Sequence, residues 1–158
     1  MKIIYVHHAE RERGNPPSQN DTITKLGIKD AKLAAKLIKN MKRWADIKCI
    51  YTSPFLRCAK TANIINKKLN LPIKFDDRLN EMGITGETWL DLQNRVRECL
   101  RDIVFTHDEK DTVICVTSGI NVAPFISLAN KQPPSEDTAK IIITSCSPLT
   151  FNIDKTCF

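Results

Sequence analysis

Residues 50–62 read IYTSPFLRCAKTA and contain the end of a strand, a turn and the start of a helix. The apolar residues before Ser53, together with Ile47 and Cys49, predict a short buried strand. Ser53 and Pro54 break it, and the residues that follow predict a helix over 55–69 with Arg57 in its first turn. Free backbone N–H groups at a helix start favour an anion, and a guanidinium can hold two phosphate oxygens at once. The segment therefore predicts a strand–turn–helix unit that binds phosphate.

The same alternation of strand and helix continues along the chain on both sides of this segment. Further strands are predicted over residues 3–6, 73–75, 112–117, 141–144 and 149–153, the last two as a hairpin around Ser147 and Pro148. Further helices are predicted over residues 24–43, 88–105 and 120–129. This order is typical of an α/β fold, a three-layer α/β/α sandwich with a mostly parallel central sheet. We expect one domain over residues 1–158.

Apolar residues at helical spacing mark the inner faces of the predicted helices. Along residues 24–43 the apolar positions are Leu26, Ala31, Ala34, Leu37, Ile38 and Met41, and lysines follow another face at Lys25, Lys29, Lys32, Lys36 and Lys39. Along residues 88–105 the positions expected to face inward are Leu90, Leu92, Val96, Leu100 and Val104. Pro124 is compatible with the helix over 120–129 only near its first turn.

Composition limits the class of partner and the compartment. The formal net charge of +6 favours anionic partners such as phosphate esters. The six cysteines form no C-x-x-C pair, so no zinc site is predicted and no cofactor is expected. The apolar run over residues 1–6 is too short for a signal peptide, and no membrane-length stretch follows. We expect a cytoplasmic protein with no membrane partner.

Three polar segments come directly after predicted strands. They are residues 7–10 (HHAE), residues 53–57 (SPFLR) and residues 117–119 (TSG). Because ligands of parallel α/β sheets bind beyond the carboxyl ends of the strands, we expect all three segments to meet at one edge. From the residues alone, His7 and His8 are candidates for a nucleophile, an acid or base, or a metal ligand, or are polar residues that simply end a strand.

These segments together resemble the histidine phosphatase superfamily, particularly its phosphoglycerate-mutase-like branch. The first family block, Arg-His-Gly-Glu, is matched by residues 7–10. The block Ser-Pro-x-x-Arg-x-x-x-Thr-Ala is matched in full by residues 53–62. A final strand that ends in Ser-His-Gly is matched by residues 117–119, with Ser118 where the family has histidine.

Three further elements of the family follow in the right order between these blocks. Residues 23–27, preceded by Asp21, match Leu-Thr-x-x-Gly, and residues 77–81 match x-Arg-Leu-x-Glu. Residues 86–88 match a Gly-Glu-Ser/Thr helix start, followed by the expected Arg-Val at residues 95–96. The short stretch between Glu81 and Gly86 lies where larger relatives carry a lid, which implies an open pocket.

The resemblance implies a role for each matching residue. His8 corresponds to the nucleophile that becomes phosphohistidine, and Glu81 to the acid that protonates the leaving oxygen. The expected phosphate-binding residues are His7, Arg57, Asn15, Ser118 and Gly119. Two of these depart from the pattern, because the family has arginine in place of His7 and histidine in place of Ser118. Histidine lacks the bidentate fork of arginine, and serine offers one uncharged hydrogen bond.

The resemblance thus implies a histidine-type acid phosphatase, a phosphomonoesterase for a small phosphorylated substrate, weakened or retuned by His7 and Ser118. A catalytically inactive domain that binds phosphate esters is the main alternative, since losing two positioned groups lowers a rate by about 10⁴ or more. A nucleic-acid partner is not expected, because the lysines fit a solvated helix face and aromatic residues make up only 6%. Hydrolysis is favoured over mutase activity because a short chain has little material to exclude water.

Overall fold

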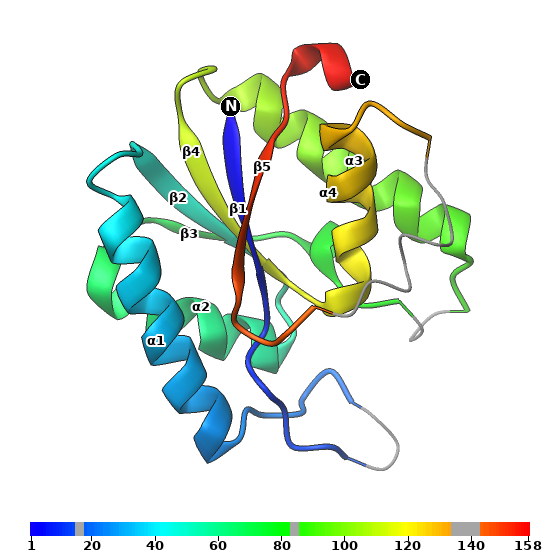
Figure 1. Cartoon of the computed structure of the whole chain (residues 1–158). Coiled ribbons are helices and arrows are strands. Elements are labelled where there is room, and N and C mark those ends of the chain that lie inside the picture. The colour runs from blue at the N-terminus through cyan, green and yellow to red at the C-terminus, as the bar shows by residue number, and fades with distance from the viewer. Residues whose placement is uncertain (15–17, 83–85, 134–142) are drawn as a thin grey trace.

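The computed structural model describes residues 1–14, 18–82, 86–133 and 143–158. The described elements follow the predicted alternation (Figure 1). In chain order they are β1 (Lys2–His7), α1 (Lys25–Met41), β2 (Ile47–Thr52), α2 (Leu56–Leu69), β3 (Ile73–Phe75), α3 (Trp89–Thr106), β4 (Thr112–Thr117), α4 (Val122–Ala129) and β5 (Pro148–Asn152). Short 3₁₀ turns cover Asp77–Leu79, Gly119–Asn121 and Lys155–Cys157.

The strands lie in the order β3-β2-β4-β1-β5, and four of them run parallel. β5 is antiparallel to β1 at one edge of the sheet. In the centre, His7 of β1 lies opposite Thr117 of β4, and Thr52 of β2 lies opposite Val116. The carboxyl ends of the three central strands are therefore level with one another, which confirms the α/β class with a mostly parallel sheet.

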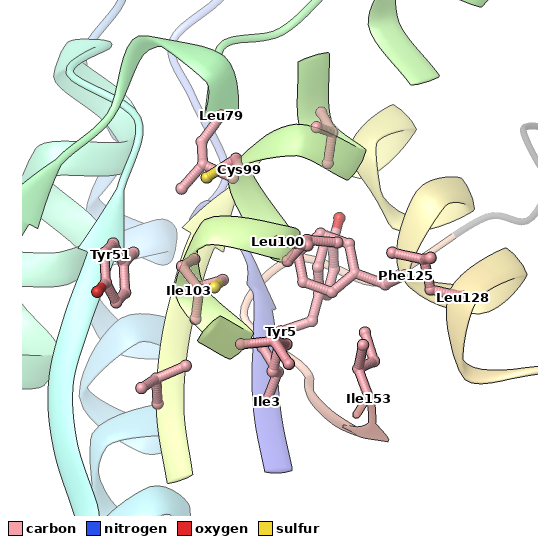
Figure 2. Close-up of a cluster of buried hydrophobic side chains, with 14 of the residues drawn as sticks. Ile3, Tyr5, Tyr51, Leu79, Cys99, Leu100, Ile103, Phe125, Leu128 and Ile153 are labelled. Carbon is pink, nitrogen blue, oxygen red and sulfur yellow. The ribbon is translucent and has the colours of Figure 1, made fainter. Parts of the chain in front are cut away.

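Alternate residues of the central strands face two separate hydrophobic clusters. Ile4 and Val6 pack with α1 and α2 on one face of the sheet. Ile3 and Tyr5 pack with α3 and α4 on the other face (Figures 1 and 2), where the aromatic ring of Phe125 lies 5.1 Å from that of Tyr5. Because both faces are covered, the strands are apolar throughout, as parallel strands between helical layers usually are.

Side-chain caps set the starts of two helices. Thr24 accepts a hydrogen bond from the Gly27 N–H at the start of α1, and Thr88 forms a reciprocal capping box with Asp91 at the start of α3. Pro124 lies in the first turn of α4, where its missing N–H has no helical partner to lose.

Several predictions of detail were wrong. Leu90 was expected to face inward but is 62% exposed, because it lies on the solvent side of the first turn of α3, whose buried residues begin at Leu92. Leu26 and Leu37 of α1 are also exposed, since the smaller Ala31 and Ala34 make the close contact with the core. The predicted hairpin around Ser147 is replaced by pairing of β5 with β1. Of the strand predicted over 141–144, residues 141 and 142 lie outside the described residues and the other two are not in a strand.

Within the described ranges, none of the helices is long and apolar enough to cross a membrane. All six cysteines are buried thiols, distributed among the three hydrophobic clusters.

Candidate active site

The three polar segments meet at the carboxyl edge of the sheet, as predicted. The His8 N–H donates to the Thr117 carbonyl at 2.8 Å, and the Ser53 N–H donates to the Val116 carbonyl at 3.1 Å. These bonds continue the hydrogen bonding between neighbouring strands by one residue, and they bring the turns after β1, β2 and β4 together. A cavity of about 390 Å³ opens at this edge. Its described lining comprises His7, His8, Glu10, Arg11, Arg13, Gly14, Glu81 and Ser145.

His8 is held as a neutral imidazole at the cavity wall. Its side chain is buried, and Nδ1 lies 2.8 Å from the Ala9 carbonyl oxygen, to which only a protonated Nδ1 can donate. Burial, and after it the neighbouring His7, lowers the pKa of His8 to about 3. The Nε2 atom therefore carries a lone pair at neutral pH, which is what a nucleophile at phosphorus requires.

Thr61 of α2 fixes the backbone beside this histidine. Its hydroxyl accepts from the Ala9 N–H at 2.9 Å and donates to the Arg57 carbonyl at 2.7 Å. Thr61 is fully buried, so both bonds are shielded from water. The threonine of the Ser53–Ala62 block thus connects the loop of His8 with the helix of Arg57, a role that the sequence pattern does not reveal.

His7 packs beside His8 and is also uncharged. The two rings are 4.5 Å apart in an edge-to-face arrangement, and His7 Nδ1 donates to the Ile143 carbonyl at 3.1 Å. A Cβ at position 119 would lie 3.2 Å from the His7 ring. The absence of a side chain on Gly119 therefore leaves room for this ring. Burial lowers the pKa of His7. At neutral pH His7 therefore brings no positive charge to the position where the family pattern has arginine.

Arg57 and Glu81 form an ion pair at the same edge. The Arg57 Nη2 group pairs with the Glu81 carboxylate, Nη1 donates to the Ser18 carbonyl at 3.0 Å, and the guanidinium lies 4.9 Å from the centre of the Phe55 ring. Arg57 is 3% exposed, whereas Glu81 is partly exposed and lines the cavity. Arg57 itself does not belong to the described lining of the cavity, and its guanidinium is connected with the cavity through Glu81.

The amides at the start of α2 are less available than the sequence predicted. The Leu56 N–H donates to the Gln19 carbonyl and the Cys58 N–H to the Phe55 carbonyl. Anion binding by this turn therefore depends mainly on the side chain of Arg57.

Three polar side chains hold the loop that carries Glu81. The Asn121 side-chain N–H₂ donates to the Leu79 carbonyl at 2.9 Å, and the Thr117 hydroxyl donates to the same oxygen at 2.6 Å. The Ser53 hydroxyl donates to Asn80 Oδ1 at 2.5 Å. Asn121 was missed in the sequence, where the only signal is a polar residue inside an otherwise apolar segment.

The other predicted phosphate-binding residues are placed differently. Ser118 is 1% exposed, and its Oγ has no hydrogen-bond partner among the described residues. Its carbonyl accepts from the Tyr5 hydroxyl at 2.7 Å. Neither Ser118 nor Gly119 belongs to the described lining of the cavity. Asn15 lies outside the described residues. In the part of the chain that the structure covers, no three His, Cys, Asp or Glu side chains are grouped to hold a metal ion.

Comparison with known proteins gives a match to one family model. The model of the histidine phosphatase superfamily (branch 1) matches residues 6–85, which include His7, His8, Arg57 and Glu81. A curated relative, the 2,3-bisphosphoglycerate-dependent phosphoglycerate mutase of Thermoplasma acidophilum, is 36% identical over 90 residues, or 53% of this chain and 43% of that protein. The chain spans less than half the length of the curated relatives it matches.

Solved structures extend the likeness of fold to almost the whole chain. Bacillus stearothermophilus YhfR matches with a TM-score of 0.81 at 21% identity, over 98% of this chain and 92% of that chain. The protein histidine phosphatase SixA complexed with tungstate matches with a TM-score of 0.76 at 18% identity, over 99% of this chain and 91% of that chain. The common architecture includes the second half of the chain, which the family model does not cover.

Proposed function

The chain belongs to the histidine phosphatase superfamily, and we propose that it is a phosphomonoesterase that hydrolyses a small phosphorylated substrate through a phosphohistidine at His8. The family supports a phosphatase in general. The observation that carries the finer proposal is the neutral, buried His8, whose Nδ1 donates to the Ala9 carbonyl beside a cavity that Glu81 also lines.

The first step transfers the phosphoryl group to the enzyme. His8 Nε2 attacks phosphorus, an N–P bond forms, and the bond from phosphorus to the leaving oxygen breaks. Arg57 faces the negative oxygens of the phosphoryl group, where a fixed cation stabilises charge without reorganisation. The Glu81 carboxyl group, in its protonated form, gives its proton to the leaving oxygen.

The second step returns the enzyme to its starting form. A water molecule attacks phosphorus and passes a proton to the Glu81 carboxylate. The N–P bond breaks, inorganic phosphate leaves, and His8 is again neutral. We expect phosphate and Glu81 to compete for Arg57, so that binding of the phosphoryl group releases the carboxyl group for proton transfer in both steps.

The second candidate is a domain that binds phosphate esters without turnover. The specific observations in its favour are the neutral His7 and the enclosed Ser118, at two positions where the family pattern has cationic or ionisable groups. Arg57 would still give such a domain affinity for phosphate.

Hydrolysis of an aryl phosphate between pH 5 and 8 separates the two candidates. We expect turnover by the wild type and only background turnover by His8→Ala. His107→Gln is the matched control, because His107 contacts Tyr51 and Asp111 away from the cavity. Acid-labile, alkali-stable labelling of the wild type by a radioactive substrate, lost in His8→Ala, would identify phosphohistidine. Equal background turnover by all three proteins, with retained phosphate binding, would favour the second candidate.

A further inference from the structure

The surface of α1 carries three exposed leucines in one line. Leu26, Leu33 and Leu37 are 54%, 56% and 48% exposed, while the smaller Ala31 and Ala34 pack against the core. Because successive helical residues are about 100° apart, Leu33 and Leu37 lie within about 20° of Leu26 around the helix axis. The three side chains form a leucine stripe about 16 Å long. It belongs to a helix that runs along the outside of the molecule (Figure 1).

Cations border the leucine stripe on its free flank. By the same geometry, Lys29 and Lys36 lie about 60–80° from the stripe on the solvent side, whereas the other flank leads to Ala34 and the core. The exposed cations of this surface are Lys25, Lys29, Lys32, Lys36, Lys39, Lys42 and Arg43. Among the residues that the structure describes, none of them forms an ion pair with a carboxylate. Whatever covers the leucines therefore meets unbalanced positive charge beside them.

We propose that the leucine stripe docks an amphipathic helix of a partner protein, one that carries acidic side chains next to its own apolar residues. Two helices pack through apolar residues that recur every three or four positions, and the charges beside that seam determine which partner is accepted. The lysines of α1 favour glutamate and aspartate at these places. The inference concerns a surface on α1 and does not depend on the proposed function of the cavity.

A second copy of this chain is a poorer occupant of the leucine stripe. In an antiparallel pair of α1 helices, Lys29 and Lys36 would lie opposite the same lysines of the other copy, and like charges repel. In a parallel pair they would face the flank that Ala34 closes against the core.

A lipid surface is also a poorer occupant. Asp30 and Asn40 lie within about 40° of the leucine stripe, so an inserted stripe would bring a carboxylate and an amide to the hydrocarbon. Burial of such groups without a hydrogen-bond partner costs free energy. A partner helix can offer a polar side chain to each of them, and a lipid chain cannot.

Fluorescence anisotropy with two labelled peptides tests the proposal. Both are amphipathic peptides of about 21 residues with leucine along one seam, and they carry either glutamate or lysine at the positions beside it. We expect the wild type to bind the glutamate peptide at least about tenfold more tightly than the lysine peptide. This preference should decrease as the salt concentration rises, because the charge pairs are exposed.

Two double variants separate the apolar contact from the charges. Leu33→Gln with Leu37→Gln removes most of the leucine stripe and should weaken binding of the glutamate peptide about tenfold or more. Lys29→Glu with Lys36→Glu reverses the charge beside the stripe, so we expect the preference to reverse in favour of the lysine peptide. All four side chains are exposed, and thermal unfolding verifies that both variants fold.

Matched controls come from the face of the sheet that α3 covers. Leu90→Gln replaces another exposed leucine. Lys110→Glu with Lys155→Glu changes the net charge by the same amount as the reversal on α1, at exposed positions after α3 and beside Phe105. Both controls should bind the glutamate peptide as the wild type does.

Three results would overturn the proposal: no binding of the glutamate peptide, equal binding of both peptides by the wild type, or an equal loss in the controls. A dimer in sedimentation experiments that Leu33→Gln with Leu37→Gln dissociates would assign the leucine stripe to a second copy instead. Binding to phosphatidylserine vesicles that the same variant abolishes would assign it to lipid, and either result overturns the proposal. No phosphate ester is present in these assays, so failure of the proposed hydrolysis would not alter their outcome.

Discussion

Burial of a neutral His8 predicts that the folded protein loses stability on mild acidification. The pKa of His8 is about 3 in the folded protein, against an ordinary value of 6.5 that we assign to the unfolded chain. Between these values the unfolded chain binds one more proton than the folded protein at this residue. The stabilisation is therefore complete above pH 6.5 and is lost progressively as the pH falls toward 3.

The size of the effect follows from the same shift. Each pH unit within the window costs about 1.4 kcal/mol, so acidification to pH 5 removes about 2 kcal/mol of unfolding free energy through His8 alone. His8→Gln has no imidazole to protonate and should lose about 2 kcal/mol less than the wild type between pH 7.5 and pH 5. Buried carboxylates with lowered pKa values, such as Asp21 and Asp111, act mainly below this range.

Urea unfolding followed by circular dichroism at pH 8, 7.5, 6 and 5 measures the difference. Between pH 8 and 7.5 the unfolding free energies of the two proteins should change by the same amount. This comparison controls for any change in stability that the substitution causes at all pH values. Equal losses for wild type and His8→Gln at pH 5 would contradict a buried neutral His8, because they would mean that His8 is solvated or already protonated in the folded state.

Three other substitutions test contacts around the site. Gly27→Ala should cost about 1–3 kcal/mol and reduce activity, because its Cβ would lie 2.5 Å from the Glu10 carbonyl oxygen; thermal unfolding and the aryl phosphatase assay measure both effects. Thr61→Val should cost about 1–3 kcal/mol because it leaves the buried Ala9 N–H unpaired, and an unchanged melting temperature would contradict the proposed link between the two segments. Glu81→Gln should lower kcat/KM much more for an alkyl phosphate than for a nitrophenyl phosphate, whose leaving oxygen needs no proton; equal losses would argue against a proton donor.

Hydrophobic periodicity was enough to predict the layers of this fold, because strands that are buried on both faces of a parallel sheet contain uninterrupted apolar runs. The run over residues 112–117 is apolar throughout for that reason, and β4 has the predicted bounds. The direction and the partner of the last strand could not be predicted from periodicity. β5 joins the sheet edge beside β1, a pairing between residues about 150 positions apart that no local pattern encodes.

For the site, too, one part of the arrangement could be predicted from the sequence and another part could not. The edge where His8 and Arg57 meet follows from the parallel topology, and motif matching singled out both residues. The contacts that set their state are tertiary: the ion pair of Arg57 with Glu81, and the hold of Asn121 on the loop before Glu81. A sequence shows that a histidine is present, but its protonation depends on burial and on neighbours brought together by folding.

Replacing the family arginine with His7 affects two requirements of the reaction differently. The nucleophile must be neutral, and burial is the largest cause of the lowered pKa of His8, so this requirement survives without a cation at position 7. The phosphoryl oxygens need positive charge, and this requirement is the one that a neutral His7 cannot meet. The substitution should therefore weaken binding and transition-state stabilisation while leaving the protonation of the nucleophile unchanged.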